Sequence, residues 1–168
     1  FTQFYGNDIT AFLNSPKAQD QFLSVLDTII LAYPISGVNI DIEPSGIEIT
    51  EELRANYVTF ITKVRQHLNA RYDEVPLTID VYASASSNTQ IWDIPRLAPV
   101  VDYVIVMAYD YHRRSSVQAG PVAPIFGGET MWDSDISQHL REFVRLMPAE
   151  KILLGMPFYG YEWQTTDQ

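Results

Sequence analysis

The chain has 168 residues, of which 46% are apolar and 19% charged, and this composition predicts one folded domain over residues 1–168 rather than disorder. Its formal net charge of −10 and the lack of any Lys or Arg run argue against nucleic acid as a partner. No stretch approaches the roughly 20 apolar residues of a membrane helix and no charged-then-apolar leader opens the chain, so we expect a soluble protein without a signal peptide in this sequence. The absence of cysteine excludes disulfides and thiolate chemistry.

The first two predicted helices flank a short strand. The first helix begins at Ser15, a favourable N-cap, with Pro16 at its first helical position. Its predicted buried face consists of Phe22, Leu23, Leu26, Ile29 and Ile30. A strand is predicted over residues 37–43, and a second helix follows Thr50 as N-cap, with an acidic first turn. The predicted buried face of this helix consists of Leu53, Tyr57, Phe60, Ile61, Val64 and Leu68.

Three further strands are predicted over residues 77–82, 103–109 and 152–158, each rich in Val, Ile, Leu or aromatic residues. A short helical turn separates the first two of these strands, and a helix that starts near Ser134 precedes the last. The apolar residues of that helix are predicted to be buried: Ile136, Leu140, Phe143 and Val144. Residues 113–128 form a loop of unusual length with Ser, Gly and Pro, which is typical of a functional loop.

The alternation of helices and strands requires parallel strands joined by crossovers, so the predicted fold class is α/β. Strand spacing of a few tens of residues suits either a doubly wound sheet or a (β/α)8 TIM barrel. No glycine-rich phosphate loop follows any strand, which favours the barrel.

The strand at residues 37–43 alternates strictly between apolar and polar residues, so that Asn39, Asp41 and Glu43 share one face. Parallel strands are normally covered on both faces, and an amide and two acids placed there carry a desolvation cost without a packing gain. Three such positions therefore favour a functional role over an acidic strand end that only caps neighbouring amides or meets solvent.

Glu43 lies nearest the C-terminal end of this strand, where barrel enzymes place their active sites. Residues two apart on a strand are roughly 6.5 to 7 Å apart at the backbone, so Asp41 and Glu43 can share a proton or raise each other's pKa. A carboxyl group that keeps its proton near neutral pH suits the protonation of a glycosidic oxygen. Glu43 is therefore the predicted acid.

At these residues the chain resembles glycoside hydrolase family 18, which is chitinase-like and carries Asp-x-x-Asp-x-Asp-x-Glu on its fourth barrel strand. The corresponding residues are Ser36, Asn39, Asp41 and Glu43, so that two of the four positions match. Ile42 stands where an aromatic residue is common in the family.

Further matches occur in the family's order along the chain. Residues 107–110 (Met-Ala-Tyr-Asp) are similar to the family's Met-x-Tyr-Asp at the end of the sixth strand, and residues 151–160 are similar to its seventh strand. Residues 120–124 and 159–163 are most similar to the bacterial branch related to spore-cortex and peptidoglycan N-acetylglucosaminidases. The resemblance implies a partial barrel that covers roughly strands three to seven, with the third strand ending near Phe4. The chain is then a piece of a longer protein or a shortened relative, and its activity by itself is left open.

The resemblance also implies a retaining, substrate-assisted hydrolysis of β-linked N-acetylglucosamine glycans of the chitin or peptidoglycan type, without cofactor or metal. In it, Glu43 is the general acid and base, Asp41 accepts from the acetamido N–H, and Tyr109 donates to the acetamido carbonyl. Four residues are the implied substrate contacts: Asn39, Asp110, Tyr159 and Trp163. Because Asn39 replaces an acid, we predict that Asp41 stays ionised over a wider pH range. The branch implies an extracellular or cell-wall-associated bacterial protein.

Other polar and aromatic residues are given structural interpretations. Asp80 and Tyr82 alternate with apolar residues and face either the barrel interior or a site. His112 is predicted to be an exposed loop residue, although it follows the Tyr109-Asp110 pair. Two further histidines, His67 and His139, are predicted to lie on helix surfaces. Trp92 and Trp132 are predicted to pack in the protein.

Three alternative predictions remain beside the hydrolase. A non-catalytic carbohydrate-binding relative is one, although such proteins have lost the acid that Glu43 represents. A metal-dependent barrel enzyme is another, in which Asn39, Asp41 and Glu43 ligate Mg²⁺ or a similar hard cation through oxygen. In the third, the chain is a structural half of a barrel and has no activity alone.

Overall fold

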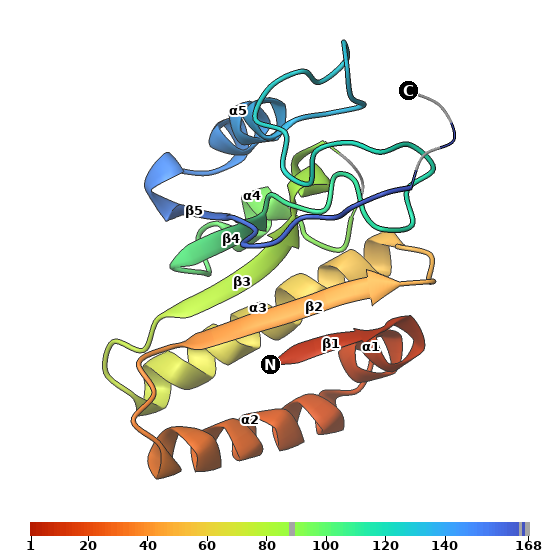
Figure 1. The fold of residues 1–168 in the computed structure, drawn as a ribbon. Helices are drawn as coiled ribbons and strands as arrows, with labels where there is room; N and C mark the ends of the chain where they lie inside the picture. Colours follow the sequence, from red (N-terminus) through yellow and green to blue (C-terminus); the bar gives the residue numbers. More distant parts are fainter. Residues whose placement is uncertain (88–89, 165, 167–168) are drawn as a thin grey trace.

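The computed structural model describes residues 1–87, 90–164 and 166, and the side chains of these residues except that of Phe4 (Figure 1). Five strands form the sheet: β1 (Thr2–Tyr5), β2 (Val38–Ser45), β3 (Leu77–Tyr82), β4 (Tyr103–Met107) and β5 (Ile152–Gly155). The α-helices are α1 (Gly6–Leu13), α2 (Pro16–Ala32), α3 (Glu51–Arg71), α4 (Ile94–Leu97) and α5 (Ile136–Leu146). Short 3₁₀ turns lie at η1 (Ala83–Ser86) and η2 (Ala149–Lys151).

All strand pairs are parallel, and the strands lie side by side in chain order, β1-β2-β3-β4-β5. A doubly wound sheet would reverse this order at a switch point, where its ligands bind. Uninterrupted order is instead what a barrel produces as each crossover adds the next strand on the same side. The prediction of a partial (β/α)8 barrel is therefore confirmed, and the strand near Phe4 is β1.

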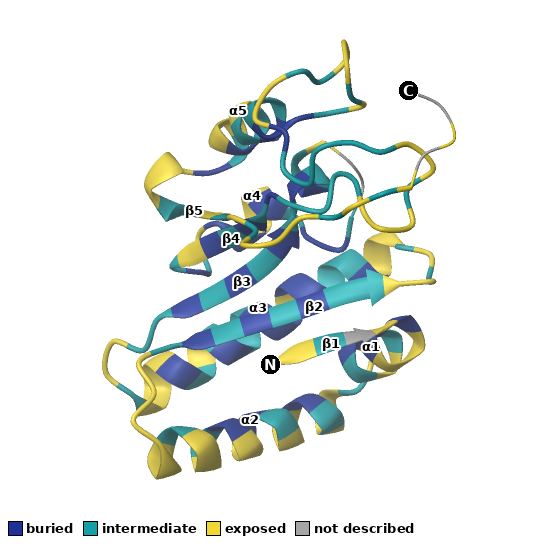
Figure 2. Cartoon of the chain, viewed as in Figure 1, coloured by how far each residue is buried: buried dark blue, intermediate teal, exposed yellow. Residues whose placement is uncertain are grey.

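The hydrophobic core lies between one face of the sheet and the helices. Figure 2 shows buried residues alternating with partly exposed ones along β2 and β3, and a buried stripe on α3. All six residues predicted for the buried face of α3 are buried, and its N-cap Thr50 accepts a hydrogen bond from the amide of Leu53 at 3.1 Å. The predicted N-cap Ser15 likewise accepts from Ala18 at 3.2 Å. Local capping signals and apolar spacing thus place these helices where the sequence predicts them.

Two predicted core residues are solvent-exposed instead. Ile29 on α2 is 42% exposed and Val144 on α5 is 51% exposed. Ile29 lines an open cavity between α2 and the start of β2. Val144 lies outside the narrow face that α5 buries through Ile136, His139 and Phe143.

The strand ends also differ from the prediction. β2 continues to Ser45, whereas β4 ends at Met107 and β5 at Gly155, both short of the predicted residues 109 and 158. Beyond β4 the chain turns away from the sheet, because Asp110 adopts a left-handed backbone conformation with φ 61°. Beyond β5, Pro157 cannot donate a backbone hydrogen bond to a ladder. The residue types of a strand therefore predict its existence better than its last residue.

Among the described residues, no helix combines the length and apolar character that crossing a bilayer would require.

Candidate active site

The polar face of the sheet lies opposite the core and brings together side chains from adjacent strands. Asn39, Asp41 and Glu43 on β2 are each partly exposed, and they alternate with the buried Ile40 and Ile42. On β3 the same alternation places Thr78, Asp80 and Tyr82 on this face. The prediction that Asn39, Asp41 and Glu43 point to one side of the strand is confirmed, and β3 adds three polar residues beside them.

The register of β2 and β3 sets which side chains are neighbours. Asn39 pairs with Thr78 and Ile40 with Ile79, and the next residues along the two strands are Asp41 and Asp80. The amide nitrogen of Asn39 donates to Asp80 Oδ2 at 2.6 Å, and the Thr78 hydroxyl donates to Asn39 Oδ1 at 2.7 Å. Two strands are therefore connected side chain to side chain across the polar face.

Asp41 is the next polar residue after Asn39 on β2, toward the C-terminal end of the strand. Burial raises the pKa of Asp41, although a hydrogen bond from the side chain of Thr2 on β1 works against the rise. One of its oxygens, Oδ1, is buried and has no hydrogen-bond partner among the described residues. A buried carboxylate oxygen without a donor is costly, so this position is typical of a functional group rather than of a stabilising one.

Glu43 has the environment expected of a proton donor. Burial raises the pKa of Glu43, and the negative charges of Asp41 and Asp80 raise it further. A hydrogen bond with Tyr82 and the charge of Arg113 oppose the rise. The carboxyl group therefore keeps its proton to a higher pH than an exposed glutamate does.

Tyr82 fixes the position of Glu43 from the neighbouring strand. Burial and the charge of Glu43 raise the pKa of the Tyr82 phenol to about 12, so the phenol stays protonated. Its ring meets that of Trp92 edge to face, with centroids 4.9 Å apart. Trp92 is fully buried, as the packing interpretation predicts, so it anchors Tyr82 from the core.

Tyr109 follows β4 and faces the same carboxyl groups. Burial raises the pKa of its phenol, and the charges of Asp80, Glu43 and Asp41 raise it further. The neighbouring strand β5 leaves room for the ring at Gly155, where a Cβ atom would lie 3.2 Å from Tyr109 Cε1. The two acids and the tyrosine predicted as catalytic therefore converge from β2 and from the chain after β4.

Asp110 has different neighbours from Asp41, Glu43 and Tyr109. Its Oδ1 accepts hydrogen bonds from the hydroxyls of Tyr159 at 2.7 Å and of Tyr161 at 3.1 Å. The ring of Tyr161 also meets that of Trp163, whose indole nitrogen donates to the carbonyl of Arg113 at 3.2 Å. Asp110 thus ties the loop after β4 to the segment after β5, and the predicted contacts Asp110, Tyr159 and Trp163 lie together.

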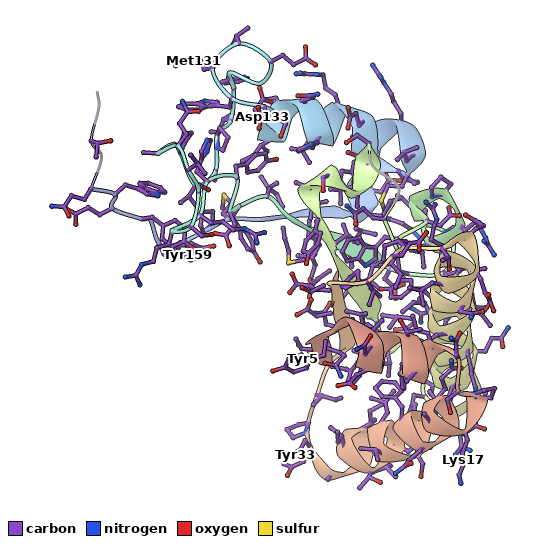
Figure 3. The ribbon with its side chains drawn as sticks, turned by 90° about the vertical axis from the view of Figure 1, so that its right-hand side faces the viewer. Tyr5, Lys17, Tyr33, Met131, Asp133 and Tyr159 are labelled. Atoms are coloured by element: carbon purple, nitrogen blue, oxygen red, sulfur yellow. The ribbon has the colours of Figure 1, made fainter. Side chains whose placement is uncertain are left out.

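A pocket of about 300 Å³ opens beside Tyr82 and Tyr109, at the C-terminal ends of β3 and β4. Its far wall comes from the 110–135 loop and from α5, and includes His112, Trp132 and His139. In Figure 3 the labelled wall residues Met131 and Asp133 lie near α5, and Tyr159 lies on the side of the sheet away from Lys17 of α2. The long loop predicted to be functional therefore forms part of a cavity that Tyr82 and Tyr109 also line.

Three histidine predictions are corrected by these positions. His139 is buried rather than on a helix surface, and the Tyr111 hydroxyl lies 2.7 Å from its Nδ1. His112 is partly buried rather than exposed, and its Nδ1 lies 3.0 Å from the Pro121 carbonyl oxygen, which is within hydrogen-bonding distance. His67 is partly buried against Asp27, at 2.7 Å. Trp132 packs against His112 but also lines the pocket.

The sequence holds little signal for these wall residues. Tyr111 and His139 are 28 positions apart, and the loop between them lacks the periodicity by which strands and helices are recognised. The unusual length of the loop at residues 113–128 was the one feature of the sequence that indicated a functional role here.

One side chain proposed as a ligand in the metal-enzyme alternative, that of Asn39, is engaged in other hydrogen bonds. Both hydrogen-bonding atoms of the Asn39 amide face Asp80 and Thr78. Within residues 1–87, 90–164 and 166, no three His, Asp or Glu side chains are grouped so that they could hold a metal ion.

The fold is a parallel barrel sheet in chain order, and β2 carries two carboxyl groups, Asp41 and Glu43, on its polar face. The chain belongs to glycosyl hydrolases family 18, because the family model matches residues 4–168.

Sporulation and chitinase proteins are among its relatives. YdhD of Bacillus subtilis (strain 168), by name a sporulation-specific glycosylase, is 30% identical over 154 residues, which cover 90% of this chain and 33% of YdhD. The cortical fragment-lytic enzyme of Bacillus anthracis is 24% identical over 169 residues, which cover 95% of this chain and 35% of that protein. The predicted resemblance to the bacterial spore-cortex branch is in keeping with both.

A solved structure supports the same fold. The Group IV chitinase of Ostrinia furnacalis in complex with allosamidin matches with a TM-score of 0.76 and 25% identity, covering 88% of this chain and 41% of the chitinase. The chain thus spans about a third to two-fifths of the length of these relatives.

Proposed function

We propose that this chain carries the acid of a glycoside hydrolase that cleaves β-linked N-acetylglucosamine glycans of the chitin or peptidoglycan type. The observation that carries the proposal is the position of Glu43 at the C-terminal end of a barrel strand, with its pKa raised by burial and by two neighbouring carboxyl groups. Family membership supports hydrolysis of glycosidic bonds.

In the proposed first step the Glu43 carboxyl donates its proton to the glycosidic oxygen as the bond to the anomeric carbon breaks. The carbonyl oxygen of the substrate's own 2-acetamido group forms a new bond to that carbon, which gives an oxazolinium ion. In the second step the Glu43 carboxylate takes a proton from water. The water oxygen bonds to the anomeric carbon as the bond from that carbon to the acetamido oxygen breaks, which opens the oxazolinium ring. The configuration at the anomeric carbon is retained, and no protein nucleophile is needed.

Asp41 and Tyr109 are the proposed partners of the acetamido group. An ionised Asp41 accepts a hydrogen bond from the acetamido N–H and stabilises the positive charge that develops on the oxazolinium ring. The phenol of Tyr109 donates to the acetamido carbonyl, and its raised pKa keeps that donor proton in place. The position of Asp41 on β2 and of Tyr109 just after β4, both within electrostatic reach of Glu43, supports these roles.

The substrate contacts proposed beyond this centre are Asn39, Asp110, Tyr159 and Trp163. The aromatic row of Tyr159, Tyr161 and Trp163 offers ring faces and edges at the cleft, with successive centroids 5.6 Å and 5.8 Å apart. An extracellular or cell-wall location is proposed with the peptidoglycan-type substrate, since two relatives are named for sporulation or cortex lysis.

The deciding experiment compares the full-length wild-type protein with its Glu43→Gln variant. It measures how fast each degrades chitooligosaccharides and peptidoglycan fragments. Loss of a general acid lowers turnover roughly 10² to 10⁴-fold, and that loss is the expected result. Glu48→Gln, an exposed glutamate after the strand, is the matched control. Equal activity of wild type and Glu43→Gln would refute the assignment, and activity abolished by a chelator would favour the metal enzyme.

A further inference from the structure

Asn39 occupies a position where the family motif has an acid, and its side chain points to an acid on the next strand. Its amide nitrogen donates to Asp80 Oδ2 at 2.6 Å, and the Thr78 hydroxyl holds the amide in that orientation through Asn39 Oδ1 at 2.7 Å. Asp80 is on β3, outside the motif. A carboxyl group is therefore present in the polar face even though the motif position is neutral.

The sheet places Asp80 and Asp41 on adjacent strands. Asn39 pairs with Thr78 and Ile40 with Ile79, so Asp41 and Asp80 are the next residues along β2 and β3, and adjacent strands lie ≈ 4.8 Å apart. Asp41 Oδ1 is buried and has no partner among the described residues. A protonated carboxyl supplies one O–H donor, so Asp80 is placed to satisfy this oxygen if the two groups hold a proton between them.

We infer that Asp80 is a positioning residue of the site, which pairs with Asp41 across the boundary between β2 and β3 so that the two carboxyl groups hold one proton in common. The pairing orients Asp41 and limits the two groups to a single negative charge beneath Glu43. The inference rests on the proposed function for its catalytic meaning, but the pairing itself is a property of the sheet.

The surroundings of Asp80 agree with a shared proton. Burial raises the pKa of Asp80 and the charge of Asp41 raises it further, whereas the hydrogen bond from Asn39 lowers it. The titratable and charged groups that face the pair come from several elements. They are Glu43 on β2, Tyr82 on β3, Tyr109 after β4, Tyr57 on α3 and the amino group of Phe1 before β1.

The first test is a pH titration of the side-chain carboxyl carbons by NMR in protein labelled with ¹³C-aspartate. In wild type, Asp41 and Asp80 are expected to titrate together in two steps that appear in both resonances, as coupled groups do. Independent single-step curves for Asp41 and Asp80 would overturn the inference. This measurement needs no substituted protein and no activity.

Two variants shift the titration in opposite directions. Asp80→Asn removes the neighbouring charge, so the titration midpoint of Asp41 is expected to fall and its second step to disappear. Asn39→Ala removes the donor to Asp80 Oδ2, so the midpoint of Asp80 is expected to rise. Asp20→Asn makes the same chemical change at an exposed carboxylate of α2 and is expected to leave Asp41 unchanged. An Asp41 curve that is the same in wild type and Asp80→Asn would contradict the pairing.

A pH–rate profile separates a positioning role from a purely structural one. In Asp80→Asn both limbs of kcat/KM against pH are expected to move to lower pH, because Asp41 and Glu43 both lose a neighbouring negative charge. A lower rate with unmoved limbs would assign Asp80 a structural role and overturn the inference. Coupled titration together with an active Glu43→Gln variant would retain the pairing and refute the proposed function instead.

Discussion

Glu43 and its neighbours show that a partly buried carboxyl group is held at a cost to the folded state. Burial and the charges of Asp41 and Asp80 raise its pKa, so the folded protein binds the proton more tightly than the unfolded chain does. By linkage, ionisation of Glu43 then opposes folding: stability falls as the pH rises through the window between the ordinary glutamate pKa and the raised one.

Glu43→Gln is therefore expected to be more stable than wild type at neutral pH, because the neutral amide escapes the cost of a half-buried charge. A gain of about 1 kcal/mol raises Tm by roughly 2–4 °C in a chain of this size. Thermal unfolding followed by circular dichroism should show the difference at pH 7, and it should vanish below the ordinary glutamate range. A lower Tm for Glu43→Gln than for wild type at pH 7 would contradict this account.

Gly120 sets the position of His112 in the pocket wall. A Cβ atom at Gly120 would lie 2.4 Å from His112 Nε2, so Gly120→Ala is expected to displace the ring and its hydrogen bond to Pro121. Overpacking of this kind costs roughly 1–3 kcal/mol. Denaturant unfolding and the ring resonances of His112 measure both effects. Gly160→Ala is the matched control, since nothing lies within 4 Å of a Cβ there.

How far single residues could be predicted depended on local pattern. The strict alternation over Asn39, Asp41 and Glu43 placed all three on one face, because the two-residue period of a strand is local geometry. The same alternation predicted that Asp80 faces either the barrel interior or a site. It could not reveal that Asn39 bonds to Asp80, since that contact depends on the register between strands 41 positions apart.

At the scale of elements, caps and apolar spacing were sufficient for α2 and α3, and α5, predicted to start near Ser134, begins at Ile136. Its N-cap is Asp135, which accepts from the amides of Gln138 at 2.8 Å and of Gly128 at 2.7 Å. The second bond joins the helix to the preceding loop. α5 is therefore coupled to the pocket wall through one carboxylate, and no local spacing rule predicts such a bond.

Asp135→Ala is expected to destabilise the protein by about 1 kcal/mol for the lost cap, with additional loss from the freed Gly128 amide. Burial acts to raise the pKa of Asp135, but the two amide hydrogen bonds dominate and lower it. The stabilisation is therefore present above the ordinary aspartate range and is lost as the pH falls through the lowered pKa. Hydrogen exchange at Gly128 and Gln138 provides the measurement. Asp135→Asn retains an acceptor and should lose less, and equal losses would argue against the cap.

At the scale of the whole molecule, strand order identified the barrel, whereas the exposed apolar residues could not be foreseen from spacing. In the described chain β1 pairs with β2 and β5 with β4, so both are edge strands of an open sheet. Leu153 and Leu154 on β5 and Val25 on α2 are exposed. A local apolar pattern marks a residue for burial without saying which element will cover it.

These edges predict that the 168-residue chain associates as its concentration rises, because unpaired strand edges with apolar side chains template further pairing. Sedimentation velocity over a range of concentrations should show the increase in mass. Leu154→Lys places a charge on the β5 edge and is expected to reduce the association, with Glu150→Gln, which changes the net charge by the same one unit outside the strand, as the control. A monomer at every concentration would contradict the prediction.

The hydrogen bonds at Asp110 have a consequence for exchanging segments between related proteins. One carboxylate receives the hydroxyls of two tyrosines that lie 49 and 51 positions further along the chain. A transplanted loop after β4 would therefore arrive without its tyrosine partners, and a transplanted segment after β5 would arrive without its acceptor. Chimeras that move the two segments as a unit retain this wall of the cleft, and those that move one alone do not.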